Sequence, residues 1–468
     1  MLKVIRLNVI RILALAFLFL TLVGKSNYAA VATDCTLYAA ANGNDGNNGL
    51  TAGAPKTLNG ANNLVGAGTV LCVEGGTYNL TTRMFLHGGS ASAYAVYKAY
   101  GDSPANIVFT GPSVNPDSVE IFNAYAPSFW TGANYIEVRG LNFDGRNVAE
   151  FGIFVDHVHH IRVIGNTIKN MLRGGFGSYH CDYLTADGNK ITHTGYGTGF
   201  QPVLMSSDIS YNASDFFDSY TGFHSYVVNN MDSGGADMSG HAEGKGVIMD
   251  LSGSGSSNTP PVLIANNVFY ENSANCVQVY FGSDIYVINN TCYKNTLDST
   301  QWNPAEVEIN TSPRSYLVNN IAYALSNTHN EFSLQGSNTG MVFRKNMYFN
   351  GAGLNFTPPD PAQFIHANPL FVNLLTTSAG QYGSALDSAS LGNALMLQAG
   401  SPAIDQGIDP TTIPGLNTNI IAGLRQYVLR DINGNPRPQG SGFDIGAYEF
   451  GSTSVATPPA APTNLRVQ

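Results

Sequence analysis

The chain is short of charged side chains. Asp, Glu, Lys and Arg make up only 12% of its 468 residues, whereas globular proteins average about 25%. This shortage excludes a coiled coil, a charge-rich disordered chain and a basic nucleic-acid-binding protein, and it disfavours long helical bundles, whose exposed faces need Lys and Glu. Gly, Asn, Ser and Thr replace the missing charges. Because 43% of the residues are still apolar, the composition predicts an all-β protein with many short strands joined by polar turns.

Long apolar runs are also lacking, except at the N-terminus. Three basic residues precede the apolar stretch 12–23, and small residues at 30–32 provide a cleavage site. The pattern predicts a secretory signal peptide over residues 1–32. The alternative, a membrane anchor, needs a longer apolar run. We therefore expect a secreted or extracellular protein, with cell-surface attachment left open and no membrane association after cleavage of the signal.

Basic residues are scarcer than acidic ones. The formal net charge is −10 at pH 7, and it becomes more negative when residues 1–32, which contain no acidic residue, are removed. An acidic protein is not drawn to nucleic acid or anionic lipid, so we expect no nucleic-acid partner. Binding of an acidic polymer would need a cation or a local basic cluster. A monomer is expected.

Cysteine is rare, with five residues in the chain: Cys35, Cys72, Cys181, Cys276 and Cys292. Secretion permits disulfides. Cys35 and Cys72 are the expected pair, because each lies in a short N-terminal strand pattern, and the odd number leaves at least one free thiol. Cys276 and Cys292 are expected to be buried and stacked without a bond, and no spacing indicates zinc.

A repeated short segment organises the middle of the chain. It is a β-branched or apolar run that ends in Asn, and it occurs at Asn166, Asn189, Asn230, Asn267, Asn290, Asn320 and Asn346. The intervals are 23, 41, 37, 23, 30 and 26 residues. A period near 23 predicts a solenoid, in which stacked repeats share one core.

Asparagine suits one corner of such a coil. It tolerates the left-handed conformation of a tight turn, and its amide can bond the Asn of the next coil. We therefore expect the seven residues to form a ladder along one corner. The two long intervals flank Asn230 and predict loops there, so we expect the functional groove near residues 180–250.

The segment 287–295 resembles the coil signature of right-handed parallel β-helix proteins, the pectate-lyase-like superfamily. Residues 37–50 and 72–78 resemble the N-terminal entry of its secreted members, and residues 400–405 and 431–449 resemble their C-terminal closure. The resemblance implies a single-stranded right-handed parallel β-helix over residues 33–450, with an N-terminal cap and a C-terminal closure.

The last residues depart from this pattern. Residues 451–468 form a Pro/Ala-rich linker that resembles the opening strand of a fibronectin type III domain.

The superfamily resemblance implies cleavage of acidic, uronate-containing polysaccharides by calcium-assisted β-elimination. A hard cation neutralises the uronate carboxylate, so that a base, usually Lys or Arg, can remove the C5 proton. The expected partner is an acidic polysaccharide, with pectate, alginate, ulvan and glycosaminoglycan all left open.

The acidic residues near the long intervals are the calcium candidates. The segment 212–218 resembles the calcium-binding segment of family 9 pectate lyases, although Ser214 replaces one of its carboxylates and Phe216 its glycine. The expected ligands are Asp182, Asp215, Asp218, Glu243 and Asp250. A polar loop cap is the structural alternative for the segment 212–218.

Lys245 is the candidate base, because it is the only lysine in residues 200–260, which contain no Arg. The segment 240–250 is similar to the one that carries the lyase base, with Ile248 in the base position and Lys245 three residues earlier. Side chains alternate along a strand, so Lys245, three residues before Ile248, would point to the opposite face. Lys245 reaches the same face only if Gly244 and Gly246 place it in a turn. The alternative is a solvated surface lysine.

His241, Tyr220 and Arg173 are the expected substrate-binding residues, and each is weighed against an ordinary surface or packing role. Two other functions stay open. One is a non-catalytic glycan-binding or cell-surface β-helix, and the other is a glycoside hydrolase. The hydrolase is less favoured, because the chain lacks the adjacent Asp pair and the Arg-Ile-Lys segment of polygalacturonases.

Overall fold

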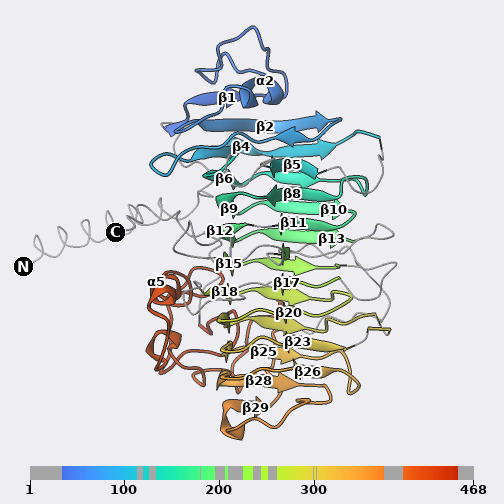
Figure 1. The fold of residues 1–468 in the computed structure, drawn as a ribbon, viewed down its shortest axis with the longest axis vertical. Coiled ribbons are helices and arrows are strands. Elements are labelled where there is room, and N and C mark those ends of the chain that lie inside the picture. The colour runs from blue at the N-terminus through green and yellow to red at the C-terminus, as the bar shows by residue number, and fades with distance from the viewer. Residues whose placement is uncertain are drawn as a thin grey trace, which may run out of the picture.

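The computed structural model describes residues 34–112, 120–125, 133–179, 181–195, 206–208, 225–235, 244–250, 261–298, 300–301, 303–373 and 394–451. Its strands stack into an elongated solenoid (Figure 1). All named strands pair in parallel and form three walls. Each complete coil passes through wall 1, wall 2 and wall 3 in that order. The fold is therefore a right-handed parallel β-helix, as expected from the sequence.

The strands of each wall follow one another in chain order. Wall 1 contains β3 (Met84–Phe85), β5 (Glu120–Tyr125), β8 (Phe151–Asp156), β11 (Gly174–Tyr179), β14 (Ser206–Asp208), β17 (Val247–Asp250), β20 (Val277–Tyr280), β23 (Ala305–Asn310) and β26 (Asn330–Gln335). Wall 2 contains β6 (Ile136–Arg139), β9 (His159–Ile164), β12 (Asp182–Asp187), β15 (Ser225–Val228), β18 (Val262–Ala265), β21 (Ile285–Ile288), β24 (Tyr316–Val318) and β27 (Val342–Arg344). Wall 3 contains β7 (Asn142–Asp144), β10 (Thr167–Met171), β13 (Lys190–Thr194), β16 (Met231–Ser233), β19 (Val268–Tyr270), β22 (Thr291–Tyr293), β25 (Ile321–Tyr323), β28 (Asn346–Phe349) and β29 (Phe364–His366).

The first coils close the N-terminal end of the solenoid. They comprise β1 (Leu37–Ala39), α2 (Leu58–Asn62), β2 (Val70–Leu80) and β4 (Ala95–Phe109). Strand β4 is long enough to pair with both β6 and β7, so it starts wall 2 and wall 3 together. Helix α2 lies over the open end in Figure 1, where its buried face covers core residues that no further coil shields.

The core is built from residues of the same kind stacked at the same position of successive coils. In wall 1 the register aligns Val247, Val277, Val307 and Phe332, none of which is exposed. Side chains alternate along each strand, so the residues between these face outward. One coil alone could not bury such a surface, and stacking supplies the core.

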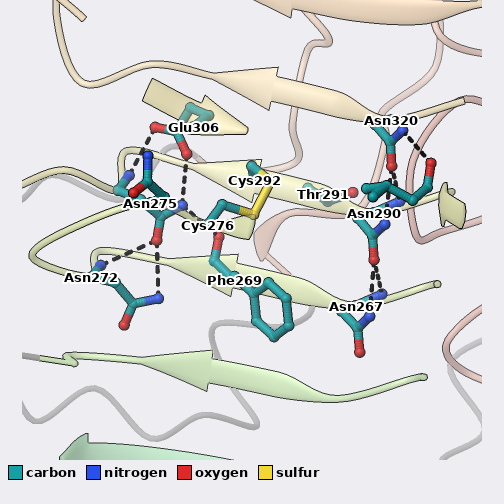
Figure 2. The surroundings of a disulfide bond; sticks show 12 residues. Asn267, Phe269, Asn272, Asn275, Cys276, Asn290, Thr291, Cys292, Glu306 and Asn320 are labelled. Atoms are coloured by element: carbon teal, nitrogen blue, oxygen red, sulfur yellow. Dashed lines mark hydrogen bonds between the residues drawn. A yellow bond between two sulfur atoms is a disulfide. The ribbon is translucent and has the colours of Figure 1, made fainter. Parts of the chain in front are cut away.

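The asparagine ladder forms as predicted, between wall 2 and wall 3. The backbone N–H and Nδ2 of Asn267 both donate to Oδ1 of Asn290, at 3.0 and 2.9 Å (Figure 2). The same pair of bonds joins each successive member from Asn166 to Asn346. The residue before Asn in several coils, such as Asn266 with φ +55°, adopts the left-handed turn.

Two disulfides link the described cysteines. Cys35 bonds Cys72, as predicted, and Cys181 is a free, buried thiol. The expectation for Cys276 and Cys292 was wrong, because these residues bond each other. Cys276 lies just before β20 in wall 1 and Cys292 lies in β22 of wall 3, so the bond joins two walls within the core (Figure 2).

The C-terminal residues run back along the outside of walls 2 and 3. Helix α5 (Thr418–Tyr427) lies beside β15 and β18 in Figure 1, and its apolar face packs on outward residues of wall 2. Nδ2 of Asn266 donates to the carbonyls of Tyr427 and Arg430, at 2.7 and 2.8 Å. The closure therefore binds the outer side of the asparagine corner.

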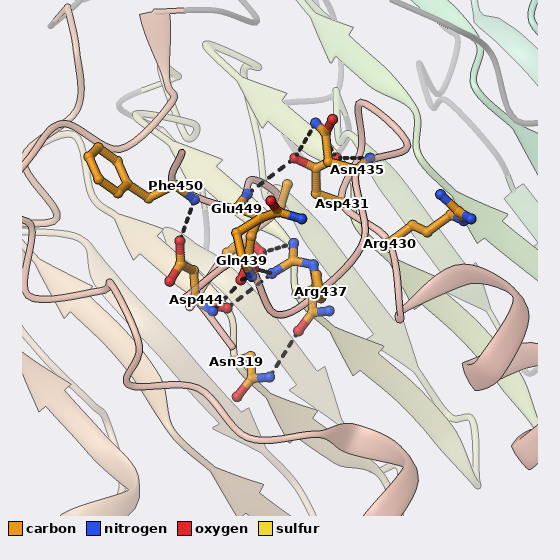
Figure 3. Close-up of polar contacts among 12 residues, drawn as sticks. Asn319, Arg430, Asp431, Asn435, Arg437, Gln439, Asp444, Glu449 and Phe450 are labelled. Carbon is orange, nitrogen blue, oxygen red and sulfur yellow. Dashed lines mark hydrogen bonds and ion pairs between the residues drawn. The ribbon is translucent and has the colours of Figure 1, made fainter. Parts of the chain in front are cut away.

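A buried ion pair organises the end of this closure. Arg437 donates through Nη1 to Oε2 of Glu449 at 3.0 Å and through Nη2 to the carbonyl of Gly446 at 2.8 Å (Figure 3). Neither charged side chain is exposed. Because an unpaired buried charge is costly, the two residues hold the segments 431–437 and 444–449 together. Within the described ranges, no helix has the length and apolar character needed to cross a membrane.

Candidate functional site

The outer face of wall 1 carries two rows of side chains, one residue per coil, that run along the solenoid. The register aligns Ile248, Gln278, Glu308 and Ser333 in the first row, and Asp250, Tyr280, Asn310 and Gln335 in the second. Neighbouring strands of a sheet lie about 4.8 Å apart. The second row offers one polar or aromatic group per coil at the surface, whereas Ile248, Glu308 and Ser333 of the first row are buried. A linear polymer lying along wall 1 would meet the groups of the second row in succession.

Glu308 is the central acidic group of the first row. It is 3% exposed, and its Oε1 accepts a hydrogen bond from Nε2 of Gln278 at 3.2 Å. Burial raises the pKa of Glu308, while the bond from Gln278 and the positive charge of Lys245 act in the opposite direction. Glu308 therefore lies within electrostatic reach of Lys245 and combines burial with a nearby cation.

Lys245 lies at the start of wall 1, two residues before β17, and it is only 2% exposed. Lys245 is therefore not the solvated surface lysine that was the alternative to a site residue. Burial of an ammonium group is rare unless it is paired, and the attraction to Glu308 supplies part of the compensation.

Two other buried acids near this row serve the structure. The oxygens of Glu306 accept from the backbone N–H and Nδ2 of Asn295, at 2.9 and 2.7 Å (Figure 2), and burial raises the pKa of Glu306 to about 8. The oxygens of Glu331 accept from the N–H groups of Gly351 and Gly353. Glu306 also lies close to the two bonded cysteines, but a disulfide provides no thiolate for a metal.

The predicted residues that can be located occupy several places on the solenoid. Asp250 ends β17 on wall 1, at the opposite end of the strand from Lys245. Asp182 begins β12 on wall 2, two coils earlier. Arg173 precedes β11. The other predicted site residues lie outside the described residues: Asp215, Asp218, Tyr220, His241 and Glu243.

Asp182 is one of two buried acids among the described residues whose carboxylate oxygens both lack a hydrogen-bond partner; the other is Asp232. The side chain of Asp182 is completely buried. Desolvation raises the pKa of Asp182 to about 8. Its register partner on the preceding coil is His159, whose pKa is lowered to about 4 by burial and by the charge of His160. Such an orphaned acid is a candidate for a bound cation or for a retained proton.

Arg173 is engaged with the preceding coil. Its Nη1 lies 2.6 Å from Oε1 of the buried Glu150, and its guanidinium lies 5.4 Å from the ring centre of Phe151. About a third of the side chain remains exposed. The exposed edge of the Arg173 guanidinium could therefore contact a substrate, while the other edge keeps its ion pair with Glu150.

Glu308, Gln278 and Tyr280 were not among the predicted site residues. The signal was present in the alternation of residues 307–310, where Val307 and Ile309 face the core and Glu308 and Asn310 face outward. The missing information was the register between coils of unequal length, which places Gln278 beside Glu308.

The chain is similar in overall structure to several solved proteins. No protein-family model matches the chain, and a search of curated proteins finds no match. The crystal structure of pectate lyase Pel9A is similar, at 18% identity and a TM-score of 0.43, over 90% of this chain and 97% of that one. The GH136 lacto-N-biosidase from Eubacterium ramulus is 14% identical with a TM-score of 0.45, over 68% and 65%. An alginate lyase from Paenibacillus sp. str. FPU-7 is 15% identical with a TM-score of 0.34, over 64% and 91%.

The strand order and register of this chain define a protein of the right-handed parallel β-helix class. The class hosts several unrelated activities, so the activity has to be argued from the residues on wall 1.

Proposed function

We propose that this protein is a secreted enzyme that cleaves an acidic, uronate-containing polysaccharide by calcium-assisted β-elimination. The observation that carries the proposal is the burial of Lys245 at the edge of wall 1, within electrostatic reach of Glu308. The second outward row of wall 1 supplies accessible hydrogen-bonding side chains along the solenoid, as a polymer site requires. The two disulfides support an oxidising, extracellular location.

In this proposal the neutral amine of Lys245 takes the C5 proton of the uronate, the C–H electron pair forms the C4=C5 double bond, and the C4–O glycosidic bond breaks, with the leaving oxygen protonated by water. Glu308 orients Lys245, and its carboxylate compensates the positive charge of Lys245 when the amine is protonated. Calcium, when bound, neutralises the uronate carboxylate and makes the C5 proton more acidic. Asp182 is suited to a cation, because its buried oxygens have no partner among the described residues. Asp215, Asp218, Glu243 and Asp250 remain the other proposed ligands.

The test is incubation with polygalacturonate, alginate, ulvan and chondroitin sulfate, with calcium or with chelator, while the absorbance of the unsaturated product is followed. Lys245→Ala should abolish elimination and leave the melting temperature of the calcium-loaded protein within a few degrees of wild type. Lys169→Ala is the matched control, because this half-exposed lysine lies on wall 3.

Absence of elimination by the wild-type protein on every uronate polymer would overturn the proposal. If the protein then still binds one of these polymers, it is a glycan-binding β-helix. Full activity of Lys245→Ala would keep the lyase and remove Lys245 as its base. The protein is proposed to act as a monomer, which light scattering coupled to size-exclusion chromatography measures directly.

A further inference from the structure

Two adjacent aromatic rings are exposed on the outer side of wall 1. Tyr280 ends β20 and is 37% exposed, and Phe281 follows it and is 41% exposed. Their ring centres lie 4.6 Å apart, with the planes at 78°. An exposed pair of rings gains little from the core, so burial does not explain why these side chains are aromatic.

The backbone does not explain Phe281 either. Its φ is +50°, in the left-handed region. Hydrogen bonds from Phe281 N to Asn310 O and from Thr311 N to Gln335 O align it with Thr311 and Gly336 of the next two coils, which are also left-handed. Glycine is the residue that this conformation favours, and a bulky side chain there is strained. The same conformation recurs at other corners of the solenoid, so the coil sets it, and it gives no structural reason for a bulky ring at this position.

The residues around the rings can form hydrogen bonds. In the second outward row, Tyr280 lies between Asp250 and Asn310, and Gln278 faces outward two residues earlier in the same strand. The strand is also held firmly, because Cys276 immediately before it is bonded to Cys292. The pair is thus presented by a rigid element, with polar groups on the neighbouring coils.

We propose that Tyr280 and Phe281 form a carbohydrate-stacking subsite that binds one or two pyranose units of a glycan chain lying along wall 1. The apolar C–H face of a pyranose packs on an aromatic ring, and its hydroxyl groups reach the amide groups of Asn310 and Gln278. A bound sugar explains why both aromatic rings are exposed and why a bulky side chain is kept at the left-handed position of Phe281. This inference rests on the proposed function, since it assumes that wall 1 is the surface that meets the glycan.

The test measures binding by retardation of the native protein in gels that contain one glycan each. The panel holds polygalacturonate and alginate as acidic glycans and galactan and xyloglucan as neutral ones. For a glycan that retards the wild type, Tyr280→Ala and Phe281→Ala should each weaken binding about fivefold, and the double variant tenfold or more. Tyr280→Phe, which keeps the ring, should bind within about twofold of wild type.

Phe85→Ala is the matched control. Phe85 is 53% exposed and lies in β3, at the N-terminal end of the same wall, so loss of a remote exposed ring should leave retardation unchanged. Phe281→Gly should raise stability, because it relieves the left-handed strain, while it weakens binding. If Phe281 had only a structural role, its replacement would not raise stability and weaken glycan binding at the same time.

The outcomes separate the subsite from the lyase activity. Retardation by a neutral glycan alone, lost in the double variant, supports the subsite and argues against uronate cleavage. Elimination on a uronate polymer with unchanged retardation of the double variant overturns the subsite and leaves the lyase intact. If no glycan of the panel retards the wild type, the subsite is overturned, and elimination then decides the lyase separately.

Discussion

The asparagine ladder allows the contribution of one side chain to stability to be calculated from its bonds. Asn267 lies in the middle of the ladder and is fully buried. Its Nδ2 donates to Val227 O and to Asn290 Oδ1, both at 2.9 Å, and its Oδ1 accepts from the N–H and Nδ2 of Asn230, at 2.9 and 3.0 Å. Replacing Asn267 by Ala removes all four bonds in a place without solvent.

The expected loss follows from which partners keep another bond. Nδ2 of Asn230 still donates to Ala186 O, and Oδ1 of Asn290 still accepts from the backbone N–H of residue 267. The N–H of Asn230 and the Asn267-bonded lone pair of Val227 O lose their partner. A buried group left without a bond costs about 1–3 kcal/mol, and a retained but weakened group costs less. We therefore expect Asn267→Ala to lower the free energy of unfolding by about 3–5 kcal/mol.

The assay is urea unfolding followed by far-ultraviolet circular dichroism, with the slope of the transition compared between variants. Asn63→Ala is the control, because Asn63 is exposed at the end of α2 and should change stability by no more than about 0.5 kcal/mol. A loss below about 1 kcal/mol for Asn267→Ala, with an unchanged slope, would contradict this prediction. It would mean that the corner is held by strand pairing and core packing alone.

Three further outcomes are expected. Because the folded pKa of Asp182 lies near 8, above its unfolded value, the folded state retains a proton that the unfolded state loses between about pH 4 and 8, and stability falls as the pH rises. Asp182→Asn should flatten this decline and raise stability at pH 8, by up to about 5 kcal/mol; chemical unfolding at several pH values that shows parallel curves would contradict it. Arg437→Met should lower stability by about 3–5 kcal/mol because it leaves Glu449 buried and unpaired, and Glu449→Gln in the same chain should restore part of the loss in urea unfolding. Millimolar calcium should raise the melting temperature relative to chelator by mass action, and identical melting curves would count against any calcium site.

Much of the fold could be predicted from the sequence, because its signals are local and repeated. Asn230, Asn267 and Asn290 follow similar apolar runs, and each needs the same turn and the same amide partner one coil away. Cys72 lies in β2 and Cys35 two residues before β1, and their bond was expected because each falls in a short N-terminal strand pattern. Such features depend on short stretches of chain, and the periodicity aligns them without knowledge of the intervening loops.

The candidate site was less accessible to this reasoning. Lys245 was selected because no other basic residue occurs nearby in the sequence, but its burial depends on how β17 sits against neighbouring coils. Glu308 lies 63 positions further along the chain, and only the register of wall 1 brings it within electrostatic reach of Lys245. Loops of unequal length separate these strands, so sequence spacing does not reveal that the two residues influence each other electrostatically.

The repeated apolar runs ending in Asn were enough to predict a solenoid and its asparagine corner, and the N-terminal strand patterns were enough to expect the Cys35–Cys72 bond. Three features came from the folded structure alone: the bond between Cys276 and Cys292 across two walls, the binding of the C-terminal residues to the outside of the asparagine corner, and the position of Tyr280 between Asp250 and Asn310. The physical reason is the same in each case. A short repeat specifies its own turn and strand, whereas contacts between coils and between walls depend on the register that packing of the whole stack selects.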